Sequence, residues 1–126
     1  MTARNRSRAS AKKAGTAFES AIAKALAEAL DDDRVERRAR SGARDRGDVS
    51  GVRCHGKRVV IEVKNEARTD LPGWTREARN EAGNDDALVG VVVSKRHGVS
   101  DPMRQWVHME LRDLIALITG QRPEEN

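Results

Sequence analysis

The apolar residues of segment 16–30 recur at helical spacing, and the segment is rich in Ala, Leu, Lys and Glu, which favour helices. We expect a helix here with Thr16 as its N-cap. At about 100° per residue, Glu19 falls inside the apolar face, beside Ile22 and Leu26. A carboxylate at such a position costs free energy unless something pairs with it. The expected apolar face consists of Phe18, Ile22, Ala25, Leu26 and Ala29.

Several later segments are β-branched or alternate between apolar and polar residues, which predicts strands. His55-Gly56 forms a turn between the second and third of them, so these two strands make a hairpin. Segment 88–94 is almost wholly apolar and is therefore the expected buried centre of the sheet. The expected strands are residues 34–41, 48–54, 58–64, 88–94 and, at an edge, 105–110.

Two further helices complete the predicted order. Residues 69–73 resemble a helix start, and Trp74, Ala78 and Ala82 then recur one turn apart. Segment 111–119 has the composition of a final helix. Helix, strands, helix, strand, strand and helix in this order predict an α/β protein, in which helices flank a mixed β-sheet.

Composition narrows the class of protein. The 126 residues are enough for one domain, and with 37% apolar and only 2% aromatic residues its core must consist of Ala, Val, Leu and Ile. Charged residues make up 35% of the chain, and a formal net charge of +4 suits a polyanionic partner. The single cysteine, Cys54, excludes an internal disulfide and fits a reducing, cytoplasmic location. Apolar runs are far shorter than the ~20 residues of a membrane span, so we expect no membrane association.

The first residues differ in composition from the rest. Residues 1–15 are rich in Arg, Lys, Ser and Ala and contain no acid, so we expect a basic, disordered arm. A transit peptide has a similar composition but requires a cleavage step. We expect a single domain over residues 16–120, followed by a short tail over 121–126.

Candidate chemistry lies on the strand 58–64. Side chains alternate between the faces of a strand, so Glu62 and Lys64 project together. The hairpin brings Asp48 antiparallel beside Glu62, so that two carboxylates and an ammonium converge. Hard cations such as Mg²⁺ prefer oxygen ligands of this kind. The alternative is an exposed face on which Glu62 and Lys64 merely form a salt bridge.

The segments SGARDRGD, which ends at Asp48, and IEVKN, which contains Glu62 and Lys64, resemble motifs of the PD-(D/E)xK nuclease superfamily. The similarity is greatest to archaeal-type Holliday junction resolvases and phage endonucleases. It implies a restriction-endonuclease-like fold with an αβββαβ core. It also implies that Asp48, Glu62 and the Val63 carbonyl bind Mg²⁺, or Mn²⁺ in its place, and that Lys64 positions a water molecule. The resemblance further implies that an acid on the first helix, which Glu19 matches, acts through a water molecule or a second ion.

Gly47 stands where that superfamily has proline, and this is the one departure from the pattern. The resemblance implies a Mg²⁺-dependent endonuclease that cuts branched or double-stranded DNA. We expect a homodimer, because symmetric cutting of two strands calls for two sites. Four basic residues are candidates for DNA phosphate contacts, or else are solvated charges: Arg40, Arg44, Arg46 and Lys95.

Other functions compete with this interpretation. A repair-type or restriction-type nicking endonuclease would use the same fold and site. A non-catalytic DNA-binding module would keep the fold without needing Asp48, Glu62 and Lys64 together. A basic structural protein of a virion or nucleoid would show no Mg²⁺-dependent activity.

Overall fold

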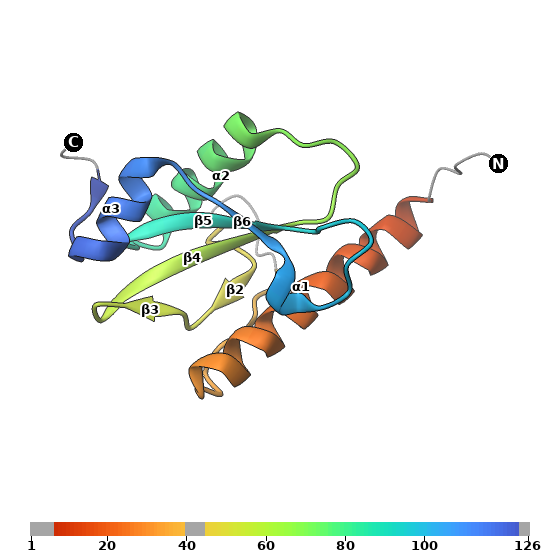
Figure 1. Ribbon diagram of the computed structural model, residues 1–126, viewed down its shortest axis with the longest axis horizontal. Coiled ribbons are helices and arrows are strands. Elements are labelled where there is room, and N and C mark those ends of the chain that lie inside the picture. Colours follow the sequence, from red (N-terminus) through yellow and green to blue (C-terminus); the bar gives the residue numbers. More distant parts are fainter. Residues whose placement is uncertain (1–6, 40–44, 124–126) are drawn as a thin grey trace.

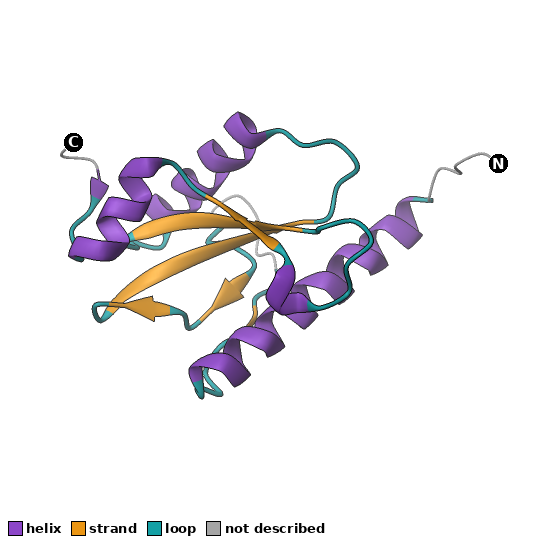
Figure 2. Ribbon diagram, viewed as in Figure 1, coloured by secondary structure: helices purple, strands orange, loops and turns teal. Residues whose placement is uncertain are grey.

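The computed structural model describes residues 7–39 and 45–123, in which six strands form one mixed sheet (Figures 1 and 2). The strand order is β1-β2-β4-β5-β6, and β3 pairs with the first part of β4. The central pair β4 and β5 is parallel, and the other pairs are antiparallel. The strands are β1 (Glu36–Arg37), β2 (Val49–Ser50), β3 (Arg53–Cys54), β4 (Lys57–Lys64), β5 (Val89–Ser94) and β6 (Trp106–His108).

Helices cover this sheet on both faces, which confirms the expected α/β architecture with a mixed sheet. Helix α1 and helix α2 lie on opposite sides of the sheet, and α3 lies near the turn between β3 and β4 (Figure 1). A single 3₁₀ turn, η1, precedes the edge strand β6. The helical elements of the described residues are α1 (Arg8–Leu30), α2 (Leu71–Asn84), η1 (Pro102–Arg104) and α3 (Leu111–Thr119).

Helix α1 is longer than the sequence pattern predicted. It begins at Arg8, and its N-cap is Ser7, whose hydroxyl accepts a hydrogen bond from the Ser10 N–H at 3.1 Å. The prediction of Thr16 as N-cap is therefore wrong, and residues 8–15 of the expected basic arm are helical. Most of these residues are Ala, Arg and Lys, which are strong helix formers even where nothing covers them. The apolar pattern marks only the part of the helix that packs against the sheet.

The predicted strand 48–54 is divided into β2 and β3. Gly51 lies between them with a φ of +93°, a conformation that favours glycine. A β-carbon at this position would lie 2.5 Å from the Arg34 carbonyl oxygen, so the two segments approach each other closely. The chain turns sharply there, and β1 pairs with only two residues of β2. Within the described residues the first strand is shorter than the predicted 34–41, and residues 40 and 41 of that prediction lie outside the described residues.

The two faces of β4 pack against different helices. Val59, Ile61 and Val63 join Phe18 and Ile22 of α1 in the largest apolar core. On the other face, Val60 packs with Ala82 and Ala87, while Trp74 and Ala78 of α2 pack on Val92. Trp74 is therefore a core residue, and the predicted alternation along β4 is confirmed. All six residues of β5 are buried, as expected of the central strand.

Helix α3 matches the predicted range and is held by the β3–β4 turn. The His55 side chain lies 2.8 Å from the Leu117 carbonyl oxygen, and Lys57 donates to the Gly120 carbonyl at 2.6 Å. These contacts satisfy carbonyl groups at the end of the helix that have no partner within it. The outer face of α3 leaves four large apolar side chains exposed, those of Leu111, Leu114, Ile115 and Ile118.

Candidate metal centre

Strand β4 places Glu62 and Lys64 on the face that α2 covers. Glu62 is 1% exposed, and its Oε2 atom lies 3.1 Å from the Lys64 ammonium. Both residues lie near the carboxyl end of β4, paired in parallel with Val92 and Ser94 of β5. The alternative of a solvent-exposed salt bridge is wrong, because both side chains are largely enclosed.

Asp48 lies beside this pair through the hairpin that the sequence predicted. Its N–H donates to the Ile61 carbonyl at 2.9 Å, and its Oδ2 atom accepts from the Val63 N–H at 2.8 Å. The Asp48 carboxylate is therefore fixed by the backbone of the same strand that carries Glu62. Asp48 is buried as well, with 7% of its surface exposed.

Gly47, directly before this aspartate, adopts a conformation that proline cannot. Its φ is +96°, whereas the proline ring holds φ near −65°. A β-carbon at this position would also lie 2.7 Å from the Val60 Cγ1 atom. The loop therefore passes over β4 by a route that only glycine accommodates without strain, and Asp45 comes just before it.

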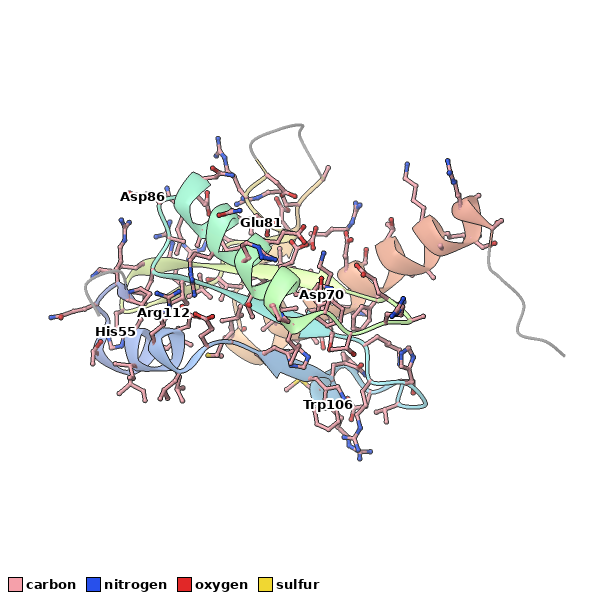
Figure 3. The ribbon with its side chains drawn as sticks, turned by 90° about the horizontal axis from the view of Figure 1, so that it is seen from above. His55, Asp70, Glu81, Asp86, Trp106 and Arg112 are labelled. Carbon is pink, nitrogen blue, oxygen red and sulfur yellow. The ribbon has the colours of Figure 1, made fainter. Side chains whose placement is uncertain are left out.

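Helix α2 supplies two further acids that the sequence pattern did not reveal as site residues. Glu77 and Glu81 lie one turn apart and so share a side of the helix. Glu77 accepts a hydrogen bond from the Lys64 ammonium at 2.7 Å, and Glu81 is only 2% exposed. Figure 3, which looks down on α2 with the sheet beneath it, labels Glu81 on this helix.

One oxygen from each of four acids comes together at this point. Ligand atoms of Asp45, Glu62, Glu77 and Glu81 all lie within 4.8 Å of one another. We call these four residues the acidic cluster. Carboxylate oxygens at this spacing suit a hard divalent cation, so the acidic cluster could hold a metal ion. Asp48 lies close enough to this group for its negative charge to raise the pKa of both Glu62 and Glu81.

Burial and like charges shift the acid–base properties of the cluster. Burial raises the pKa of the Glu62 carboxyl, and contact with Glu81 and the charge of Asp48 act in the same direction. Burial also raises the pKa of Glu81, an effect that its contact with Glu62 opposes and that the charge of Asp45 reinforces. Burial alone would lower the pKa of Lys64, but its contacts with Glu77 and Glu62 raise it overall, so the ammonium stays charged.

Three buried oxygens of Glu62 and Glu81 are suited to contact with a cation. Among the described residues, the Glu62 Oε1 atom and both side-chain oxygens of Glu81 have no hydrogen-bond donor. Ionised carboxylate oxygens only accept hydrogen bonds, so a proton shared between Glu62 and Glu81, or a positive ion, would satisfy these three oxygens. The carboxylate oxygens of the acidic cluster, two of them on buried and two on half-buried residues, therefore suit a bound metal ion.

Glu19, the expected catalytic acid of α1, lies outside this group of four. Its Oε1 atom accepts from the Arg37 side chain of β1 at 3.0 Å, and its side chain is 22% exposed. The position that the helical pattern placed inside the apolar face is thus half-buried and occupied by an ion-paired carboxylate. The pairing with Arg37 explains how the helix tolerates this acid.

The basic residues expected to contact DNA occupy different settings. Arg46 is exposed in the loop before β2, between Asp45 and Gly47. Lys95 instead donates to the carbonyls of Arg96 and Val99, at 2.8 and 2.6 Å, and so holds the loop after β5. Arg40 and Arg44 lie outside the described residues.

Comparisons with known proteins give no family assignment. No protein-family model matches the chain, and no significant match is found among curated proteins or among solved structures. Within the part of the chain that the structure describes, none of the helices has the length and apolar character of a membrane span.

Proposed function

We propose that the protein is a metal-dependent endonuclease that hydrolyses phosphodiester bonds in branched or double-stranded DNA. One observation carries the proposal: Glu62, Lys64 and a backbone-fixed Asp48 lie together at a buried site rich in carboxylates. The mixed sheet and flanking helices support membership of the PD-(D/E)xK superfamily, with its restriction-endonuclease-like fold. The sequence motifs around Asp48 and Glu62 support it independently.

In this proposal Asp48, Glu62 and the Val63 carbonyl bind Mg²⁺, for which Mn²⁺ can substitute. When bound, the cation would offset negative charge on the scissile phosphate and make water a better nucleophile. The Val63 N–H orients the Asp48 carboxylate, because it donates to Oδ2. Lys64 supplies a fixed positive charge, which stabilises the negative charge that develops on the phosphate. Its contacts with Glu62 and Glu77 keep that charge in place.

The proposal extends to the partners of the protein. Cutting both strands symmetrically requires two copies of the site, so the active form is a homodimer. Arg46 and Lys95, together with Arg40 and Arg44, contact phosphates in this proposal. Light scattering measures the mass in solution directly, and a monomer on DNA would favour a nicking endonuclease instead.

A cleavage assay on defined DNA substrates tests the proposal. The full chain is incubated with junction, flap, duplex and single-stranded DNA, with Mg²⁺ or with EDTA. We expect cleavage only with Mg²⁺, and none in Asp48→Asn or Glu62→Gln, both of which still bind DNA. Glu66→Gln is the matched control, because exposed Glu66 also lies near Lys64, at 3.7 Å, yet is not in the acidic cluster.

Two results would contradict the proposal. Cleavage by either variant at a near wild-type rate would show that the site is wrongly assigned. Binding of DNA without cleavage in Mg²⁺ or Mn²⁺ would favour a non-catalytic DNA-binding protein.

A further inference from the structure

Glu81 occupies a position of α2 that would ordinarily be apolar. The buried residues of this helix are Trp74, Ala78, Glu81 and Ala82, so Glu81 lies in the row that packs on the sheet. It is 2% exposed, and no donor among the described residues reaches either of its side-chain oxygens. An ionised carboxylate in such a place is strongly destabilising unless a positive charge accompanies it.

The ammonium of Lys64 does not fill this role. Its ion pairs are with Glu62 and Glu77, at 3.1 and 2.7 Å, and with exposed Glu66 at 3.7 Å. The Lys64 ammonium is thus engaged by neighbours of Glu81. Among the described residues around this point, the carboxylates outnumber this lysine.

The spacing of the surrounding oxygens suits one cation. Oxygen ligands about 2.3–2.6 Å from a Ca²⁺ ion lie at most about 5 Å from one another, and those of the smaller Mg²⁺ ion lie closer together. The four ligand atoms of the acidic cluster meet this limit, since all lie within 4.8 Å of one another. They come from three separate parts of the chain: the loop at Asp45, strand β4 and helix α2. The Asn84 side chain of α2 donates to the Asp45 carbonyl at 2.9 Å, which ties the loop to the helix.

This group differs from the set proposed for catalysis. Asp48 is not one of its four members, and the Asp48 Oδ2 atom is engaged by the Val63 N–H. Only Glu62 belongs to both sets. Glu62 has one oxygen near Lys64 and a second oxygen without a donor, so it can serve both.

We infer that Asp45, Glu62, Glu77 and Glu81 form a divalent-cation site of their own, with Glu81 as its buried ligand. It is additional to the Asp48 site of the proposed function and depends on that proposal only through the shared Glu62. A cation there joins α2 to β4 and to the loop before β2. Binding therefore stabilises the folded domain as well as neutralising the acids.

Counting bound Mn²⁺ tests this site without any DNA. The full chain, stripped with EDTA and dialysed, is titrated with Mn²⁺, and free Mn²⁺ is followed by electron paramagnetic resonance. Wild type and Glu66→Gln should bind the same number of ions, and Glu81→Gln and Glu81→Leu should each bind one fewer. Leucine suits the buried position and has no ligand atom, so this variant separates loss of a ligand from loss of folding. Glu81→Gln should lower the affinity of the site for Mn²⁺ by at least about 10- to 100-fold. Loss of a residue that only supports a metal ligand already has an effect of this size.

A melting experiment gives a second readout. Saturating Ca²⁺ should raise the melting temperature of wild type and Glu66→Gln by more than that of either Glu81 variant. Equal Mn²⁺ counts in wild type and Glu81→Leu would overturn the inference and mean that Glu81 is held as a neutral acid.

The result also separates this inference from the proposed function. Asp48→Asn should retain the ion that Glu81→Leu loses. If no DNA is cut but this ion still binds, the nuclease proposal fails and the cation site stands. If DNA is cut while the Glu81 variants bind as many ions as wild type, the inference of this cation site fails and the nuclease proposal stands.

Discussion

The two faces of strand β4 differ in what they bury. Toward α1, Val59, Ile61 and Val63 pack with apolar residues only. Toward α2, Val60 is followed by Glu62 and Lys64, and the helix itself contributes acids to the same point. One strand of eight residues therefore supports a hydrocarbon core on one side and a cluster of charges on the other.

The difference shows how a small domain accommodates so many buried charges. The α1 face removes large aliphatic side chains from water, which is the main source of stability in a domain of this size. The α2 face uses small residues such as Ala78 and Gly90, where a β-carbon on Gly90 would lie 2.1 Å from the Ala78 carbonyl oxygen. The helix thus approaches the sheet closely, and this brings its acids to Glu62.

Moving an acid to the apolar face should have the largest effect. Ile61→Glu would bury a carboxylate among Phe18, Ile22 and other apolar side chains, without a lysine or cation beside it. We expect a loss of about 3–5 kcal/mol in the free energy of unfolding, as for other uncompensated buried charges. Urea unfolding followed by circular dichroism measures it. The reciprocal change, Glu62→Gln, should leave a cooperative transition, and equal losses for both would contradict the distinction between the faces.

The apolar face was also the part that the sequence predicted best. Alternation along 58–64 determines which side chains share a side, because that relation is local to the strand. The hairpin through His55 likewise brought Asp48 beside β4 as expected, since turn residues and strand register are short-range properties. The prediction of Glu62, Lys64 and Asp48 as neighbours follows from these two local rules.

The charged face was predicted only in part, for a physical reason. The spacing of Trp74, Ala78 and Ala82 predicted that α2 packs on the sheet. Glu81, three residues after Ala78, lies in the same buried row but is not part of that apolar pattern. The neighbours of Glu81 in the acidic cluster include Glu62 of β4 and Asp45 of the loop before β2. These segments are distant in the sequence, and helix or strand periodicity does not predict contacts between distant segments. A carboxylate in an apolar row was the available signal for Glu81, as it was for Glu19.

Removing the one ammonium of the charged face should have the next largest effect. Lys64→Ala should lower the DNA cleavage rate about a hundredfold, as expected for losing a positioned electrostatic group. The Mg²⁺ concentration for half-maximal rate should change little, because an ammonium is not a ligand. Single-turnover kinetics at several Mg²⁺ concentrations separate the two quantities.

Lys57 at the other end of β4 provides the control for this experiment. Lys57→Ala removes the same charge from the same strand, but its partner is the Gly120 carbonyl of the α3 terminus. It should cut DNA at a near wild-type rate. An unchanged maximal rate in Lys64→Ala with a large rise in the Mg²⁺ requirement would identify Lys64 as a structural partner of the carboxylates.

A smaller effect should distinguish the two roles open to Glu19 on α1. If its carboxylate assists the site, Glu19→Gln should reduce cleavage about tenfold, in the range seen for outer partners of metal ligands. Arg37→Gln breaks the same ion pair from the other side and should leave cleavage intact. For a partly exposed pair, either change should alter stability by less than about 1 kcal/mol. Equal cleavage rates in the two variants would mean that Glu19 serves only the ion pair.

The smallest expected effect is the contribution of the buried acids on the α2 face to the pH dependence of stability. Burial holds the pKa of Glu62 and of Glu81 above the ordinary value of 4.5. Between that ordinary value and the raised ones, the folded protein binds more protons than the unfolded chain, so stability falls as pH rises. In EDTA, the melting temperature should therefore decrease from about pH 5 to about pH 8.

Glu81→Gln should flatten this slope, because it removes one of the two groups. Glu28→Gln, exposed on α1, should leave it unchanged. A melting temperature that rises over this range in wild type would mean that the buried acids are stabilised in their ionised form, contrary to the burial argument.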